Sequence, residues 1–308
     1  MHYSIHRVAV RAPFDFRRTL SFACSFSPMQ GEQEAHEGRL VKAFSVGGQS
    51  VLVRAETAPG RALDLTLDSD TPLDAHAVQR VVERVRFVLS LDDDLTPFYA
   101  RATSDASLAP VVRALHGMHH LKFPSAFEIT CWAILVQRTP IPVARAIKRA
   151  LTARWGGAVT RGAGMHRTFP DAARIAALAP AELAELVPSA RKVEQLRTIA
   201  EAFASIDADA HLRALPFGQA EDWLDALPGI GPWSKAFILF RGLGRMEHAT
   251  LEGPLLDCAR RVYGTRPSIA ELERIADGYG ADVGLWALYL RVGAGAAAAA
   301  PRRAAAAG

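Results

Sequence analysis

The stretch Leu227-Pro228-Gly229-Ile230-Gly231-Pro232-Trp233 constrains the fold of this chain more than any other. It lies between two apolar helical runs, at 223–226 and 236–240. Two glycines separated by one apolar residue permit a tight turn, and without Cβ atoms another backbone can approach closely. Pro232 suits the first position of a new helix, because its missing N–H would have no partner there. The pattern predicts a helix–turn–helix whose N–H groups and positive dipole end bind a phosphate, although a bare Gly-x-Gly would indicate only an ordinary connection.

Composition and charge indicate a globular protein of about two domains. Half of the 308 residues are hydrophobic and 22% are charged, which excludes a disordered chain. The net charge of +4 fits a polyanionic partner without requiring one. The cysteines, Cys24, Cys131 and Cys258, form no C-x-x-C pair, so no metal framework is expected. Because no signal core or membrane-spanning apolar run occurs, we expect a cytoplasmic protein without membrane contact.

The first part of the chain, residues 1–91, predicts an α+β domain with an antiparallel sheet. Strand patterns occur at 2–10, 40–46, 50–56 and 61–67, and helical patterns at 14–26 and 75–91. The Gly47-Gly48 pair predicts a hairpin turn, and Asp74 predicts a helix cap. We find no candidate chemistry in this domain.

From residue 92 the strand patterns stop, and residues 92–292 predict an all-α domain. Helical patterns cover 123–137, 140–155, 170–178, 180–187, 189–204, 219–226, 232–241, 253–263, 268–278 and 283–292, with a loop at 156–164. Residues 293–308 are rich in alanine and glycine and include Arg302 and Arg303. We expect this segment to be a disordered basic tail.

Four separated stretches resemble one family, the 3-methyladenine DNA glycosylase II type of the helix-hairpin-helix DNA glycosylase superfamily. They are 127–137, 189–193, 227–244 including the glycine turn, and 285–290. Their order and separation agree with the family, and the resemblance covers most of residues 1–292. It implies an α+β N-terminal domain followed by an all-α helix-hairpin-helix glycosylase domain.

The resemblance also implies a strategy. Such enzymes bind the backbone of double-stranded DNA with the hairpin, flip a damaged nucleotide out and cut its N-glycosidic bond. Carried over to this chain, Gly229 and Gly231 supply N–H groups to a phosphate, and hairpin carbonyls hold a monovalent cation. No other cofactor is implied, and we expect a monomer.

A base pocket must distinguish damaged from normal bases, because a phosphate contact gives no information about the base. An alkylated purine is cationic and binds well against aromatic faces. Trp233 and Phe237 are four residues apart on the second hairpin helix, hence on one face, and both match aromatic pocket positions of the family. The alternative is that both are core aromatics, which is the interpretation we prefer for Trp132 and Trp286.

Gln137 and Arg138 end a helix where the family places a wedge that fills the gap left by the flipped base. Arg138 departs from the usual apolar wedge and equally fits a phosphate contact.

Position 233 decides the reaction type. Lyase members of the superfamily carry a lysine there, whose amine attacks the sugar. Trp233 cannot do this, and Lys235 lies about 200° further around the helix. We therefore expect a monofunctional glycosylase.

The catalytic aspartate of the family has no direct counterpart, because an ungapped match from Trp233 ends on Gly253. Glu252 adjoins that position and is our candidate for the catalytic carboxylate, with a helix-capping acidic residue as the alternative. Asp257 fits a surface charge better.

Two functions of different classes follow. The first is an enzyme that excises alkylated purines with Glu252 and the aromatic pocket. The second is a DNA-binding relative that recognises damaged duplex without efficient excision because the usual aspartate is replaced. We favour the enzyme, since a labile alkylated purine needs less catalytic help than a neutral base.

Overall fold

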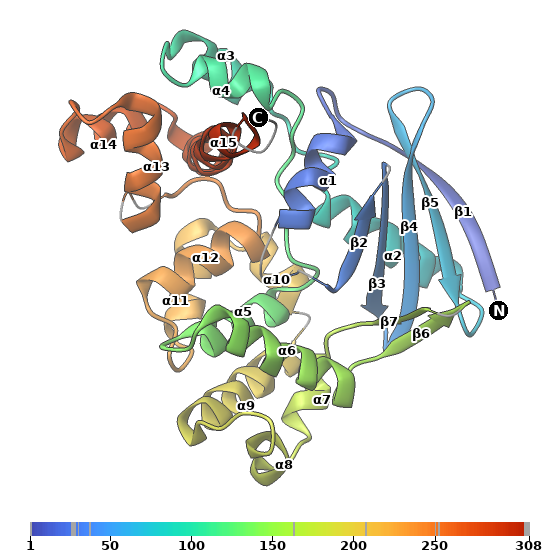
Figure 1. Ribbon diagram of the computed structural model, residues 1–308. Coiled ribbons are helices and arrows are strands. Elements are labelled where there is room, and N and C mark those ends of the chain that lie inside the picture. The colour runs from blue at the N-terminus through green and yellow to red at the C-terminus, as the bar shows by residue number, and fades with distance from the viewer. Residues whose placement is uncertain are drawn as a thin grey trace.

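A five-stranded antiparallel sheet forms the N-terminal part of the chain in the computed structural model, which describes residues 2–25, 29, 31–36, 38–162, 164–206, 208–249, 251 and 253–304 (Figure 1). The strands, in the order β1-β5-β4-β3-β2, are β1 (His2–Ala9), β5 (Ala62–Ser69), β4 (Gln49–Ala58), β3 (Arg39–Val46) and β2 (Gln33–His36). All four predicted strands are present, and β2 adds an edge strand that was not expected.

The sheet follows from local sequence. Gly47 and Gly48 have φ angles of 59° and 76°, and this double positive φ fits the twist of the β3–β4 hairpin. α1 (Phe16–Ser25) follows β1, and α2 (Ala75–Val88) lies against the sheet (Figure 1). The predicted cap is confirmed, since the Asp74 carboxylate accepts a hydrogen bond from the Ala77 N–H at 2.7 Å. Three buried valines of α2 pack in the same core as the inner sheet face: Val81, Val85 and Val88.

Helices make up most of the remaining chain, and the predicted fold class is confirmed. They are α3 (Thr96–Ser104), α4 (Ala109–Ala114), α5 (Ala126–Val136), α6 (Ile141–Trp155), α7 (Ala172–Ala176), α8 (Pro180–Ala184), α9 (Ala190–Ala204), α10 (Ala208–Ala214), α11 (Phe217–Asp225), α12 (Pro232–Gly242), α13 (Gly253–Tyr263), α14 (Ile269–Asp277) and α15 (Val283–Ala304), with a short 3₁₀ turn at Gly280–Asp282. α5 is central, because all its side chains from Ala126 to Leu135 are buried. Within the described part of the chain, no helix is both apolar enough and long enough to span a membrane.

Two expectations about this helical part were wrong. The segment expected to be a loop forms the antiparallel hairpin β6 (Ala158–Arg161) and β7 (Gly164–Arg167). Its buried Val159 packs with Val41, Ala43 and Leu52 on the outer face of the main sheet.

The second difference concerns the predicted disordered tail. α15 continues past Val292 to Ala304, and Ala294 is buried. Alanine has the highest helix propensity, which favours continuation of the helix over the expected break. Residues 305–308 lie outside the described residues.

Two apolar clusters form the core. The first extends from the sheet through α5 and α9 to the glycine turn, and the second joins α3, α4, α13, α14 and α15. As predicted, Trp132 is buried in the first cluster and Trp286 in the second.

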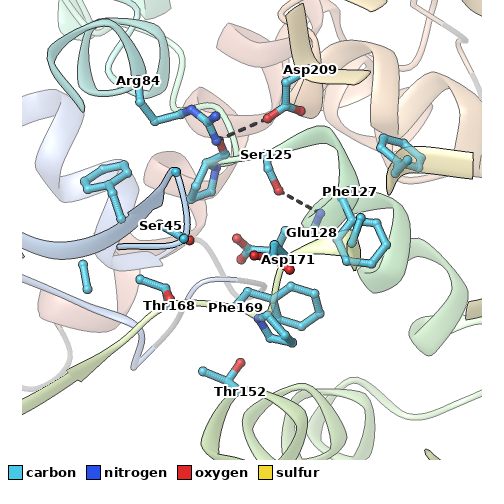
Figure 2. A pocket seen from close by; sticks show the side chains of 18 of the residues that line it. Ser45, Arg84, Ser125, Phe127, Glu128, Thr152, Thr168, Phe169, Asp171 and Asp209 are labelled. Atoms are coloured by element: carbon cyan, nitrogen blue, oxygen red, sulfur yellow. Dashed lines mark hydrogen bonds and ion pairs between the residues drawn. The ribbon is translucent and has the colours of Figure 1, made fainter. Parts of the chain in front are cut away.

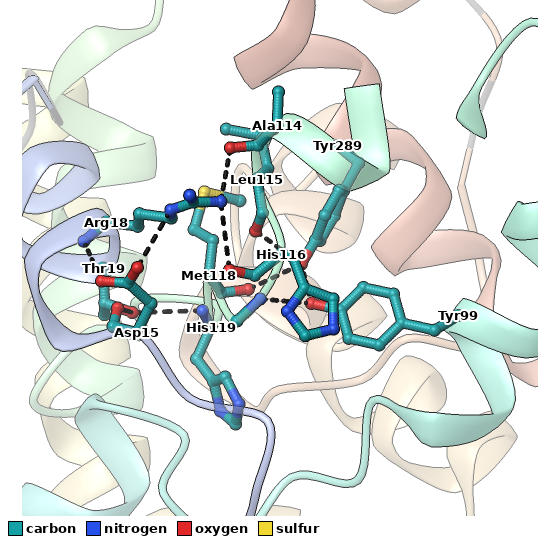
Figure 3. Close-up of polar contacts among 11 residues, drawn as sticks. Asp15, Arg18, Thr19, Tyr99, Ala114, Leu115, His116, Met118, His119 and Tyr289 are labelled. Carbon is teal, nitrogen blue, oxygen red and sulfur yellow. Dashed lines mark hydrogen bonds and ion pairs between the residues drawn. The ribbon is translucent and has the colours of Figure 1, made fainter. Parts of the chain in front are cut away.

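Polar contacts fix the C-terminal helix to the segment before α5. The Tyr289 hydroxyl lies 2.7 Å from the Tyr99 hydroxyl and donates to the Met118 carbonyl at 2.9 Å, in the network drawn in Figure 3. In the same network, the Arg18 guanidinium on α1 donates to the Ala114 carbonyl. These contacts connect three regions that are distant in the sequence.

Candidate functional site

The predicted helix–turn–helix is present as α11, a turn at 226–231 and α12. The buried side chains of Leu227 and Ile230 anchor the turn, and the Ile230 N–H donates to the Leu227 carbonyl at 3.4 Å. Pro232 occupies the first turn of α12, as expected. The turn therefore presents the N-terminal, positive end of an 11-residue helix.

Gly229 and Gly231 differ in whether the structure has room for a side chain. Gly229 has a φ of 80°, and a Cβ there would come 2.0 Å from Nε2 of Gln195. Gly231 has an ordinary φ of −96° and caps α12, and a Cβ there would meet nothing within 4 Å. The N–H groups of both glycines donate to no residue that the structure describes. Both donors are thus available for an external acceptor such as a phosphate oxygen.

Gln137 brings the end of α5 to this turn. Its side-chain amide donates to the Gly229 carbonyl at 2.8 Å and lies 3.4 Å from the Ser234 hydroxyl. Arg138, the next residue, is exposed and has a φ of 50°, in the left-handed region that non-glycine residues rarely adopt. The chain therefore turns sharply at Arg138 and leaves its side chain in solvent beside the hairpin.

A groove of about 490 Å³ runs next to this corner, between the end of α5 and the first turn of α9. Arg138 and the exposed Arg191 both line it. Lys192 is held differently, because its ammonium donates to the Leu135 carbonyl at 2.7 Å and to the Thr139 hydroxyl at 2.6 Å. The groove thus carries two arginines for an anionic partner, while the lysine supports the backbone.

Trp233 and Phe237 lie on one face of α12 and stack on each other. Their ring centroids are 5.3 Å apart with an interplanar angle of 9°. Trp233 is 60% exposed, whereas Phe237 is half-buried and packs edge-on against buried Phe123 at 6.4 Å. The interpretation of Trp233 as a core aromatic is wrong, because the indole presents a free face to solvent beside the turn.

Lys235 points away from these aromatic rings, as expected. Its ammonium donates to the Asp225 carboxylate at 2.9 Å and lies 3.5 Å from Glu221, both on α11. The hydrogen bond to Asp225 raises the pKa of Lys235, so the amine stays protonated and is not a nucleophile at neutral pH.

The candidate carboxylate, Glu252, lies outside the described residues. The next residue, Gly253, begins α13. Of the neighbouring carboxylates, Asp257 is exposed on α13 and Glu247 pairs with Arg245 at 3.2 Å. Within the described part of the chain, no group of three His, Cys, Asp or Glu side chains is placed to hold a metal ion.

Two supporting residues of the site were not found by sequence reasoning. Gln195 packs over Gly229 from α9, and Phe123 supports Phe237 from the segment before α5. Both lie far in sequence from the hairpin, and no local pattern marks either of them.

Known proteins are similar to this chain in both sequence and fold. Residues 5–128 match the family described as AlkA N-terminal domain. The chain is 28% identical to DNA-3-methyladenine glycosylase of Bacillus subtilis over 212 residues, covering 68% of this chain and 70% of that protein. It is 30% identical over 244 residues to the probable bifunctional transcriptional activator/DNA repair enzyme AlkA of Mycobacterium tuberculosis, covering 77% of this chain and 46% of that protein.

The fold agrees over almost the whole length. The solved structure of the 3-methyladenine DNA-glycosylase from Archaeoglobus fulgidus superposes with a TM-score of 0.78 at 20% identity, covering 94% of this chain and 98% of that chain. The sheet domain, the glycine turn and the helical body are therefore parts of one shared architecture. The chain is thus similar in sequence to DNA-3-methyladenine glycosylase and AlkA proteins, and in fold to a 3-methyladenine DNA-glycosylase.

Proposed function

We propose that this protein is a monofunctional DNA glycosylase that hydrolyses the N-glycosidic bond of alkylated, 3-methyladenine-type purines after flipping them out of double-stranded DNA. The observation that carries the proposal is the exposed indole of Trp233, stacked on Phe237 directly after a turn with two free N–H donors. The named activity of the Bacillus subtilis relative supports the same substrate class.

Different parts of the site have different roles in this proposal. The N–H groups of Gly229 and Gly231 bind a backbone phosphate, and Arg138 fills the gap in the base stack or contacts a second phosphate. The flipped base, which is cationic, lies against the indole and phenyl faces. Discrimination then depends on the charge and the flat shape of the alkylated base.

Hydrolysis needs little more than a water molecule and a negative charge. The bond between the purine nitrogen and C1′ of the sugar breaks, and its electron pair neutralises the departing base. Water adds to C1′, and its proton passes to a carboxylate, for which we propose Glu252. The same carboxylate stabilises the oxocarbenium ion that develops before water attacks.

Several further properties belong to this proposal. No strand cleavage is expected, because Lys235 is paired with Asp225 and Trp233 has no amine.

We propose that carbonyls of the turn at 227–231 hold a monovalent cation. The Gly229 carbonyl fits this role, since it accepts only one described hydrogen bond and has a second lone pair. We also propose that the enzyme acts as a cytoplasmic monomer.

The test is release of methylated bases from alkylated double-stranded DNA. We expect the wild type to release 3-methyladenine without nicking the strand, and Trp233→Ala to lower the rate about tenfold through the lost cation–π contact. Glu252→Gln should lower the rate at least as much. Tyr3→Ala, which removes an aromatic ring that is 73% exposed on β1, serves as the matched control.

Equal rates for the wild type and Glu252→Gln would remove Glu252 from the mechanism. No release by the wild type, combined with preferential binding of alkylated DNA, would replace the enzyme with the damage-recognising relative.

A further inference from the structure

A second polar cavity lies where the sheet domain meets the helical body, away from the hairpin. It has a volume of about 310 Å³ and is bounded by β3, α2 and the N-terminal ends of α5 and α7 (Figure 2). The exposed Gly47-Gly48 turn and Ile206, which is 41% exposed, are among its lining residues. The cavity is thus in contact with solvent and large enough for about ten water molecules or one small organic molecule.

The carboxylates that line this cavity already have partners in the protein. Glu32 and Glu128 both accept hydrogen bonds from Lys148, each at 2.7 Å. Asp171 accepts from the Arg174 N–H and caps α7. Asp209 accepts from the Ala126 N–H. Figure 2 shows its ion pair with Arg84. Each acidic group is therefore engaged by a protein donor, which makes the cavity a poor cation site.

Two buried side-chain donors, Lys42 and Thr152, line this cavity and make no hydrogen bond within the described part of the chain. Lys42 on β3 is only 4% exposed, and its ammonium makes no hydrogen bond to any residue that the structure describes. Thr152 on α6 is 8% exposed, and its hydroxyl has no hydrogen-bond partner among the described residues. Burial lowers the pKa of Lys42 even though Glu128 and Glu32 attract its charge. A buried ammonium that makes no hydrogen bond costs free energy that an anionic ligand would offset.

Other residues that line the cavity would contact the apolar part of such a ligand. Three phenylalanine rings lie along one side, with Phe127 6.1 Å from Phe169 and 5.6 Å from Phe203. Arg167 also lines the cavity and adds positive charge, with its guanidinium donating to the Ala153 carbonyl at 2.9 Å. We propose that this cavity binds a small organic oxyanion, with its acidic group on Lys42 and Thr152 and its flat apolar body against Phe127 and Phe169.

This site is independent of the proposed DNA site. The cavity lies at the first turn of α5, whereas the contact between Gln137 and the glycine turn lies beyond its last turn. Variants at Lys42 or Thr152 therefore report on the cavity without changing the hairpin.

The experiment is calorimetric titration of the full chain with benzoate, phenyl phosphate and benzyl alcohol at constant ionic strength. We expect saturable binding of at least one of the two anions, and the tighter one identifies the head group as carboxylate or phosphate. Lys42→Met should weaken that binding about tenfold or more, and Thr152→Val severalfold, because a charge-assisted hydrogen bond contributes more than a neutral one. Benzyl alcohol should bind weakly and equally to the wild type and Lys42→Met.

Lys235→Met is the charge-matched control, since Lys235 lies on α12 outside the cavity. A measurement on the wild type keeps the test decisive if Lys42→Met does not fold: in [15N]lysine-labelled protein, the Nζ resonance of Lys42 should shift during the anion titration. The proposal is overturned if neither anion binds saturably at millimolar concentration, or if Lys42→Met and Lys235→Met bind the anion equally well.

Discussion

Gly229 and Gly231 are separated by one residue, but they serve the turn in different ways. Gly229 is required by the protein itself, because its φ of 80° and the amide of Gln195 exclude a side chain. Gly231 has an ordinary backbone conformation and open space where a Cβ would be. A glycine that the fold does not need is instead explained by a ligand that approaches the backbone closely. The proposed function therefore predicts that Gly229 serves stability and Gly231 serves DNA binding.

Gly229→Ala should lower the free energy of unfolding by about 2–4 kcal/mol, since it combines a strained φ with a steric clash. Urea denaturation at neutral pH measures this. Gly264→Ala is the matched control, because Gly264 has a φ of 84° but no atom within 4 Å of a Cβ. Equal losses in the two variants would show that the Gln195 contact adds nothing.

Gly231→Ala should change stability by less than about 1 kcal/mol, the usual range for a cap position. Its affinity for duplex DNA should nevertheless fall about tenfold, because a methyl group keeps the phosphate from the N–H groups. Fluorescence anisotropy with a labelled duplex measures this affinity. Unchanged binding would mean that the phosphate contacts another part of the surface.

At the scale of elements, Lys148 joins three segments in the interior. It lies on α6 and is fully buried, and its two carboxylate partners come from α5 and from the loop before β2. Lys148→Met leaves the buried Glu128 and the half-buried Glu32 without this cation, so the free energy of unfolding should fall by about 3–5 kcal/mol. Arg154→Met, which breaks the exposed pair of Arg154 and Glu185, should have little measurable effect on urea denaturation.

The same lysine predicts a dependence on pH. Burial alone would lower the pKa of Lys148, but the attraction of Glu128 and Glu32 outweighs it and raises this pKa. Because the pKa of Lys148 is raised in the folded state, its ion pairs contribute fully to folding stability below the unfolded-state pKa of about 10.4. This contribution is lost as the pH rises further, through the folded-state pKa. The stability difference between the wild type and Lys148→Met should therefore narrow above that pH. A constant difference would contradict this reasoning.

Local patterns predicted most elements but none of the long-range clusters. The Gly47-Gly48 turn, the Asp74 cap and the glycine-cornered hairpin each follow from a few adjacent residues and are present as expected. The β6–β7 hairpin was missed because its strands have four residues each and only Val159 is buried. The cavity beside Lys42 could not be predicted from the sequence, because its charged residues come from many separate segments.

At the scale of the whole molecule, the first apolar cluster joins the sheet to the central helices. The first cluster contains Leu40 and Leu65 from the sheet together with Ile129 and Trp132 from α5, and it continues to Ile230 in the glycine turn. The orientation of the turn therefore depends on packing that begins at the sheet. The N-terminal domain therefore contributes to the packing that orients the hairpin of the helical domain.

The shared core predicts that residues 1–91 do not fold on their own. Without the helical body, the side chains of Leu40, Phe44 and Leu65 lose part of the apolar cluster to which they belong, and Lys42 loses the carboxylate of Glu128. The apolar area left in water costs about 25 cal/mol per Å², which is large against the small net stability of a domain of this size. We expect the 1–91 fragment to give a poorly dispersed proton–nitrogen NMR spectrum and no cooperative urea transition, whereas the full chain gives both. A dispersed spectrum with cooperative unfolding would establish the sheet domain as an independent unit, and the packing that orients the hairpin would then have to originate within α5 and α9 alone.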